Sequence, residues 1–232
     1  MASSAIIFIT LIIISDATAF RPSAAPFSRQ SRLLSSDFDF SSKQGWDDFY
    51  EDKESKSYEW HASVPHSSIS SIVSPVKSDD QLLVLGCGTS SLSADLYDTL
   101  KPCKLTSLDY SLACITEMNN RYEDTDRENL HFIQGDAKSL NEHFDLNQFT
   151  SIVDKGLIDA IMTSDDWDSS IAKILKGASS VLAPGGSYVL VSYNLSKSTK
   201  KYLNEMGYFH FTYDLEGSND RVSISKGIKT TK

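Results

Sequence analysis

This sequence has few cysteines, the residues whose disulfides stabilise small secreted domains. Its three cysteines, Cys87, Cys103 and Cys114, form no Cys-x-x-Cys pair and cannot all pair with one another. A disulfide framework is therefore excluded, and we expect free thiols in a reducing compartment. The five histidines also lack the spacing of metal ligands, so no metal site is expected.

Positive charge is scarce as well. The chain has 22 Lys and Arg against 31 Asp and Glu, which gives a formal net charge of −9. Nucleic-acid-binding proteins normally present a basic patch, so nucleic acid is not an expected partner. The apolar block at residues 5–14 is too short to cross a bilayer comfortably, and we expect no stable membrane span in the mature chain.

Residues 1–36 have the composition of a targeting leader. The apolar block fits the core of a signal peptide, and Ala17-x-Ala19 is an acceptable cleavage site. Residues 21–36 carry arginines and many serines but no acid, which is typical of a transit peptide. Together with Phe20 after the cleavage point, the leader resembles the bipartite plastid presequence of algae with secondary red plastids. A plastid location is predicted, with secretion or a mitochondrial location as alternatives.

The rest of the chain divides into an N-terminal extension, residues 37–80, and a domain at residues 81–232. In the domain, strand-like and helix-like patterns alternate, which predicts a mostly parallel sheet with helices on both faces. The last two strands have no helix between them and predict an antiparallel hairpin at the sheet edge. Strands are expected at 82–86, 104–109, 130–134, 149–153, 187–193, 208–214 and 221–226, and helices near 90–100, after Ser111, from about 171 to a stop at Pro184-Gly185-Gly186, and at 200–206.

The first predicted strand ends in a glycine turn that favours a nucleoside ligand. Gly86-Cys87-Gly88 follows an apolar run, and the next strand ends about twenty residues later in Asp109. Glycines let the backbone approach a ligand, and an acid at this distance accepts hydrogen bonds from ribose hydroxyls. The third glycine of the dinucleotide fingerprint is missing, which favours S-adenosylmethionine (SAM) over NAD.

Three segments carry a more specific resemblance. Residues 84–93, residues 107–111 and Val153-Asp154-Lys155-Gly156-Leu157-Ile158-Asp159-Ala160 are similar to the methyltransferase-like 13 group of class I SAM-dependent methyltransferases, which methylate lysines of elongation factor 1-alpha. The resemblance covers residues 45–195 and implies a Rossmann-like seven-stranded methyltransferase sheet. The chain departs from the family at Leu157, where threonine is usual, and at His61, where an aromatic residue is usual.

The resemblance and the strand ends together suggest a cofactor site. Gly86 and Gly88 would approach the methionine portion and Asp109 the ribose, since ligands lie beyond the carboxyl ends of parallel strands. The adenine would meet Tyr110, Asp136 and the backbone of Ala137.

The extension and the fourth strand are expected to complete the site. Trp46, Tyr50 and Trp60 would close over the cofactor, unless these aromatics only pack against the sheet domain. Asp154 and Lys155 would lie beside the transferable methyl group and position the substrate, Lys155 also touching the cofactor; a buried ion pair is the alternative. Among the five histidines only His61 could reach the site, although a surface position is expected for it. Asp159 is expected as a helix-start charge, and Cys87 is expected only to pack.

These features predict methyl transfer from SAM to a lysine of a protein substrate. A dry pocket favours the neutral amine, so no dedicated base is required. A small-molecule methyltransferase on the same fold and a non-catalytic SAM-binding module remain alternatives. A nicotinamide reductase is the weakest of the functional hypotheses.

Overall fold

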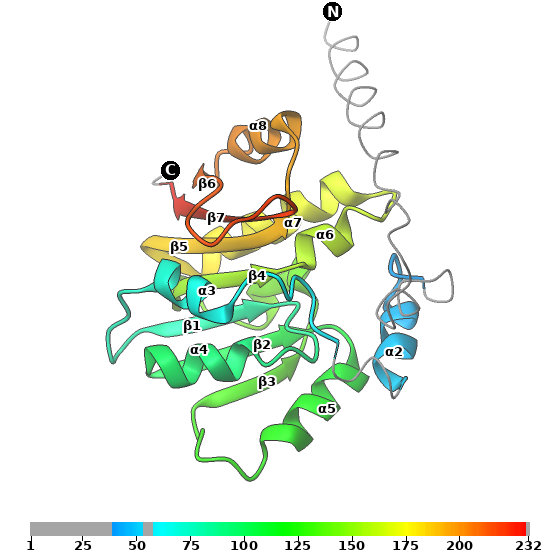
Figure 1. The fold of residues 1–232 in the computed structure, drawn as a ribbon, viewed down its shortest axis with the longest axis vertical. Helices are drawn as coiled ribbons and strands as arrows, with labels where there is room; N and C mark the ends of the chain where they lie inside the picture. The colour runs from blue at the N-terminus through cyan, green and yellow to red at the C-terminus, as the bar shows by residue number, and fades with distance from the viewer. Residues whose placement is uncertain (1–38, 53–57, 231–232) are drawn as a thin grey trace, which may run out of the picture.

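The computed structural model describes residues 39–52 and 58–230 (Figure 1). The predicted leader, residues 1–36, lies outside the described residues. Two helices, α2 (Lys43–Glu51) and α3 (His66–Val73), precede the sheet domain. In Figure 1, α2 lies beyond the ends of the first strands, on the side toward which their arrows point.

A seven-stranded sheet forms the centre of the molecule. Its order is β3-β2-β1-β4-β5-β7-β6, and β7 runs antiparallel to both of its neighbours while the other pairings are parallel. The predicted Rossmann-like sheet with an antiparallel C-terminal hairpin is confirmed. The strands are β1 (Gln81–Leu85), β2 (Lys104–Asp109), β3 (Leu130–Gln134), β4 (Phe149–Lys155), β5 (Leu182–Tyr193), β6 (Phe209–Thr212) and β7 (Val222–Lys229).

Helices cover both faces of the sheet because successive strand residues point to opposite sides. Leu82 and Val84 of β1 belong to a core with α3, α4 (Leu92–Leu100) and α5 (Leu112–Tyr122). Leu83 and Leu85 belong to a second core on the other face. The elements of that face are η3 (Ala137–Glu142), α6 (Leu157–Ile161), α7 (Trp167–Val181) and α8 (Lys197–Glu205). None of the helices in the described ranges combines the length and the apolar character needed to cross a bilayer.

Several element boundaries differ from those predicted. The prediction that Pro184-Gly185-Gly186 stops the long helix is wrong, because α7 ends at Val181 and these residues lie inside β5. There the pairing of β5 with β4 is irregular, as expected where proline and glycine interrupt a ladder. The helix α8 starts earlier than predicted because Ser196 caps it, its side chain accepting from the Thr199 amide.

The extension of β4 matters most for function. The strand was predicted to end at residue 153, yet its pairing with β5 continues through Lys155 opposite Val191. Asp154 and Lys155 are therefore consecutive strand residues, and their side chains leave opposite faces of the sheet.

Candidate functional site

The turn after β1 requires glycine. Gly86 and Gly88 have φ of +58° and +53°, a left-handed conformation that side-chain-bearing residues rarely adopt. A Cβ on Gly88 would also lie 2.8 Å from Oη of Tyr50. The missing side chain therefore lets the tyrosine of α2 approach the turn.

Asp109 ties this turn to the end of β2. Its carboxylate accepts hydrogen bonds from the amides of Gly88 and Ser111, each at 3.0 Å. The side chain is almost fully buried, and burial raises the pKa of Asp109 to about 6. Each carboxylate oxygen has a second lone pair, so Asp109 can accept further hydrogen bonds.

The helix α2 lies over this end of the sheet. Asp47 accepts a 2.6 Å hydrogen bond from the hydroxyl of Ser111, the residue that caps α5. The Tyr110 hydroxyl donates to the Ser42 carbonyl at 3.2 Å. These contacts attach α2 to the residues that follow Asp109. We call α2 and the segment of residues 58–61 the cover, because both are expected to lie over the cofactor.

Aromatic side chains fill the space between α2 and the segment before α3. Trp46 and Tyr50 stack at 5.7 Å between ring centroids, and Trp46 and Trp60 lie 6.0 Å apart. The Trp46 Nε1–H donates to the Phe40 carbonyl at 2.9 Å. The structure thus brings together the three aromatics expected over the cofactor, and in doing so also gives them the packing role of the alternative reading.

Lys155 links this cover to the sheet. Its Nζ donates to the Trp60 carbonyl at 2.8 Å and to the Glu59 carboxylate, which also accepts from the Ser90 hydroxyl at 2.8 Å. Burial acts to raise the pKa of Glu59, but hydrogen bonds from His66 and the charge of Lys155 lower it to about 2. Burial lowers the pKa of Lys155, against the attraction of Glu59.

Asp154 is placed differently from Lys155. It is fully buried, accepting from the Tyr188 hydroxyl at 2.7 Å and from the Leu157 amide at 2.9 Å, and burial raises its pKa to about 7. It therefore anchors the start of α6, while Lys155 reaches the cover. The two residues do not form the buried ion pair considered as an alternative.

The third strand end contributes Asp136 and Ala137. Asp136 caps η3, accepting from the Lys138 amide at 2.9 Å, and its side chain remains 45% exposed. Ala137 is buried. The Gly135 amide donates to the Asp109 carbonyl at 2.9 Å, so the two strand ends are directly joined.

The pairing of His61 with Asp159 was not predicted. The prediction of a surface histidine is wrong, because His61 is only 8% exposed. Its Nε2 lies 2.8 Å from a carboxylate oxygen of Asp159, which also accepts from the Tyr193 amide at 3.2 Å. The one signal in the sequence was the departure from the family pattern at position 61.

Polar atoms that are buried without a partner concentrate here. Within the described residues, five such side-chain atoms occur, and three belong to the glycine turn or its cover. Buried polar groups are normally hydrogen-bonded, so this concentration indicates a place for a polar ligand. The three are Trp60 Nε1, His61 Nδ1 and Thr89 Oγ1.

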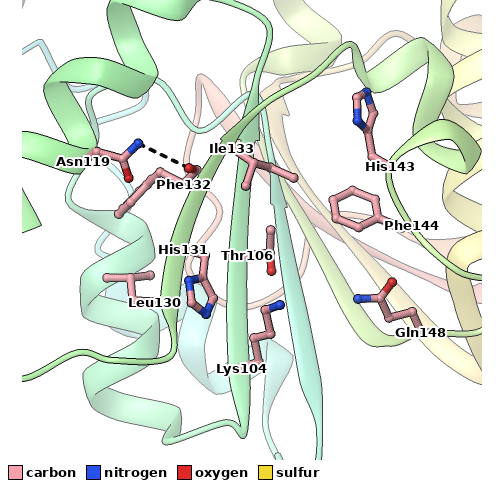
Figure 2. A pocket seen from close by; sticks show the side chains of 10 residues that line it. All are labelled: Lys104, Thr106, Asn119, Leu130, His131, Phe132, Ile133, His143, Phe144 and Gln148. Carbon is pink, nitrogen blue, oxygen red and sulfur yellow. Dashed lines mark hydrogen bonds between the residues drawn. The ribbon is translucent and has the colours of Figure 1, made fainter. Parts of the chain in front are cut away.

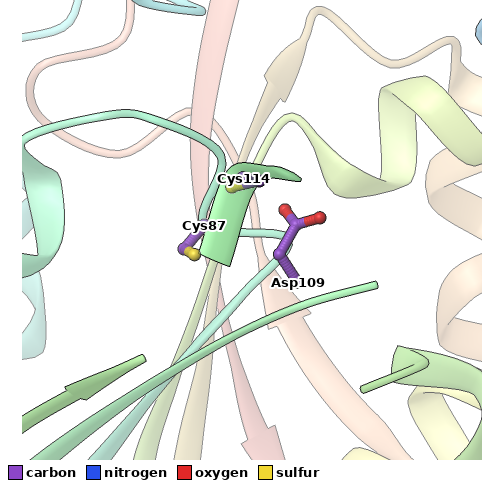
Figure 3. A group of neighbouring side chains, drawn as sticks. All are labelled: Cys87, Asp109 and Cys114. Carbon is purple, nitrogen blue, oxygen red and sulfur yellow. The ribbon is translucent and has the colours of Figure 1, made fainter. Parts of the chain in front are cut away.

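One buried thiol, Cys87, belongs to the turn, and a second, Cys114, lies beside it. Figure 3 shows Cys87 and Cys114 beside Asp109, with the two sulfurs and a carboxylate oxygen all within 4.8 Å. The hydrogen bond with Cys87 and burial both raise the pKa of the Cys114 thiol, which disfavours the thiolate that a metal would need. All three residues are buried, consistent with the packing role expected for Cys87.

A surface hollow lies away from this region. Lys104 and Leu130, which line it, are the first residues of β2 and β3, whereas Asp109 is the last residue of β2 (Figure 2). The hollow runs along β3 from Leu130 to Ile133 and contains none of the predicted site residues.

Comparison with known families agrees with this geometry. A family model described as a methyltransferase domain matches residues 76–221. The chain belongs to this methyltransferase family. The resemblance expected from the sequence is thereby confirmed at the level of the family.

Curated relatives narrow the comparison. This methyltransferase is 34% identical over 155 residues to the eEF1A lysine and N-terminal methyltransferase of Danio rerio, covering 66% of this chain and 21% of that protein. It is 30% identical over 167 residues to EEF1A lysine methyltransferase 4 of Mus musculus, covering 68% and 63% respectively. The chain thus spans about a fifth of the length of the Danio rerio relative.

Solved structures share the fold. The YcgJ protein of Bacillus subtilis superposes with a TM-score of 0.60 at 13% identity, covering 74% of this chain and all of that one. A Haemonchus contortus phosphoethanolamine N-methyltransferase 2 in complex with S-adenosyl-L-methionine gives a TM-score of 0.55 at 12% identity, covering 72% and 52%. At these identities the likeness supports the fold alone.

Proposed function

We propose that this protein transfers methyl groups from SAM to a lysine side chain of a protein substrate. Membership of the methyltransferase family supports the reaction class. The names of the curated relatives support lysine as the acceptor and eEF1A as the first candidate substrate. The acidic net charge of −9 favours a protein partner over nucleic acid.

The observation that carries the cofactor assignment is the hydrogen bond between the Gly88 amide and Asp109. It holds a glycine turn against a buried carboxylate at the adjoining ends of β1 and β2, where nucleoside ligands of such sheets bind. Asp109 would accept the ribose hydroxyls, Tyr110, Asp136 and Ala137 would surround the adenine, and Gly86 and Gly88 would admit the methionine portion. The unpartnered Trp60 Nε1–H and Thr89 hydroxyl fit a ligand with a carboxylate and an amino group.

The cover supplies the other requirement of the reaction. SAM provides an electrophilic methyl group on a sulfonium, so the protein must align the acceptor and exclude water. Tyr50 approaches the turn at Gly88, Trp46 packs against both Tyr50 and Trp60, and Lys155 holds the segment that contains Trp60. In this proposal Lys155 is a positioning residue, and Asp154 acts only through α6.

The experiment uses purified protein, tritiated SAM and two acceptors, recombinant eEF1A and a fractionated extract of the source cells. We expect a labelled protein band that disappears with Asp109→Ala. Label found only in small molecules would replace this proposal with a small-molecule methyltransferase. Tight SAM binding without any label would leave a non-catalytic binding module.

We also propose a plastid location, supported by the composition of residues 1–36. The eEF1A of the cytosol would then be out of reach, and the labelled band from the extract would identify another target. Fusing residues 1–36 to a fluorescent protein tests the location. Fluorescence in the secretory pathway or in mitochondria would contradict it.

A further inference from the structure

A buried histidine–carboxylate pair joins the cover to the first turn of α6. His61 directly follows Trp60, whose carbonyl binds Lys155, so the pair lies at the carboxyl end of β4. The His61 ring lies 2.8 Å from Asp159 through Nε2 and edge-on to the Tyr193 ring at 4.7 Å. The Tyr193 amide donates to both oxygens of Asp159, at 3.3 and 3.2 Å, and so fixes the carboxylate.

This arrangement sets the tautomer of the histidine. A carboxylate only accepts hydrogen bonds, so Nε2 of His61 must carry the hydrogen that Asp159 accepts. The neutral imidazole then has its lone pair on Nδ1. That nitrogen is buried and has no partner among the described residues, so a basic atom is held ready for a ligand's hydrogen.

The backbone supports a demanding placement of this side chain. His61 has φ of +55°, an uncommon conformation for a residue other than glycine. Its Nε2 also lies 3.4 Å from where a Cβ on Gly156 would be, beside the turn between β4 and α6. Such strain persists only where surrounding contacts maintain it, and it occurs often at functional sites.

We propose that His61 is the catalytic base that removes the proton from the substrate lysine, a role for which the sequence alone required no residue, and that Asp159 orients it. The proposal rests on the proposed lysine methylation. The substrate ammonium gives one proton to Nδ1, leaving an amine and an imidazolium paired with Asp159. The amine lone pair forms the new N–C bond, the methyl–sulfur bond breaks with its electrons going to sulfur, and the product is a methylated ammonium. His61 then releases its proton to water.

The groups around the pair define its electrostatics. Asp159 on α6 and Tyr193 on β5 face His61 directly. Burial raises the pKa of Asp159, opposed by the hydrogen bond from His61. Beyond them lie Asp154, which interacts with Asp159, and Arg221, which interacts with Tyr193. Lys155 lies one residue away, on the Trp60 carbonyl.

A His61–Asp159 pair that only stabilises the fold would show the same contacts. The test must therefore separate a structural role of His61 from a catalytic one. His61→Gln keeps a donor at the position of Nε2 but has no basic nitrogen. With tritiated SAM and the acceptors named above, we expect this variant to lower kcat at neutral pH by about 10²–10⁴ with little change in the Kd for SAM. Its rate should then rise about tenfold per pH unit toward the ordinary lysine pKa of about 10.4, because solvent supplies the neutral amine.

The matched control is His210→Gln, the same change at an exposed histidine of β6. It should follow the wild-type pH profile. If His61→Gln retains a constant fraction of wild-type activity at every pH, the His61–Asp159 pair has only a structural role and the proposal is overturned. If the wild-type protein labels no acceptor, the proposed function itself fails, whatever the variant does.

A second readout needs no turnover. Long-range ¹H–¹⁵N NMR of the protein without SAM, with the His61 signals assigned by their loss in His61→Gln, reports the tautomer. We expect Nε2–H with bare Nδ1 at mildly alkaline pH, and a mixture of tautomers in Asp159→Asn. A hydrogen on Nδ1 in the wild-type protein would refute the assignment, even if His61→Gln failed to fold.

Discussion

The contact between Glu59 and Lys155 should contribute a large share of the free energy that holds the cover on the sheet. Lys155 is 5% exposed and Glu59 28% exposed, so most water is excluded from the pair. Glu59→Gln removes the charge while keeping the size of the side chain. It leaves the ammonium of Lys155 with only the Trp60 carbonyl and no anion, which is costly in a buried place.

The magnitude follows from the pKa. A carboxyl whose pKa falls from 4.5 to about 2 on folding stabilises the folded state by about 3 kcal/mol at neutral pH. The partial exposure of Glu59 reduces this to about 2 kcal/mol. Because the folded-state pKa is the lower one, this stability is complete above pH 4.5 and is lost as the pH falls toward 2.

A double-mutant cycle measures the pair directly. Urea unfolding at neutral pH, followed by tryptophan fluorescence, compares wild type, Glu59→Gln, Lys155→Met and the double variant. We expect Glu59→Gln to cost about 2 kcal/mol alone and clearly less in the Lys155→Met background, where only the contacts of Glu59 with His66 and Ser90 remain to be lost. An equal cost in both backgrounds would show that the two residues are independent, and the reasoning would be wrong.

Three further outcomes are expected. Gly88→Ala places a methyl 2.8 Å from Tyr50 Oη and should weaken SAM binding more than about tenfold in calorimetry. The control Gly185→Ala, at φ of +76° and with no neighbour within 4 Å, should cost about 1 kcal/mol of strain and leave the affinity for SAM unchanged. SAM affinity should fall below about pH 6, because protonated Asp109 loses acceptor capacity; an affinity that is constant from pH 5 to 8 would contradict this. Asp154 binds its proton more tightly in the folded state, so its contribution to stability should fall as the pH rises from about 4 to 7, by at most about 4 kcal/mol, and Asp154→Asn should make the fall in Tm over that range smaller, leaving the part due to Asp109.

The sheet could be predicted because its signals are local. Apolar runs of strand length, ended by Gly86 or Asp109, fix β1 and β2 without knowledge of the tertiary structure. The end of α7 could not be predicted in the same way. Pro184 and Gly185 break helices, but they serve here inside β5, where the preceding Leu182 pairs with Phe149. Strand pairing overrode local propensity there.

The same distinction between local signals and tertiary contacts applies to the candidate site. Residues at strand ends, such as Asp109 and Asp136, could be assigned because topology alone brings them together. The pairing of His61 with Asp159 spans 98 positions and depends on how the cover folds back. Composition carries no signal for such a contact. Asp154 and Lys155 do not pair with each other, since neighbouring strand residues face opposite sides, and their predicted role in positioning the substrate stays a prediction.

The dependence of Lys155 on Glu59 also decides where this domain can be divided. The family match begins at residue 76, but a buried lysine of β4 finds its counter-charge before that point. A sheet transplanted from residue 76 onward would lack both Glu59 and the Trp60 carbonyl, and the Lys155 ammonium would lose its counter-charge. The smallest unit that keeps this counter-charge therefore begins at or before Glu59.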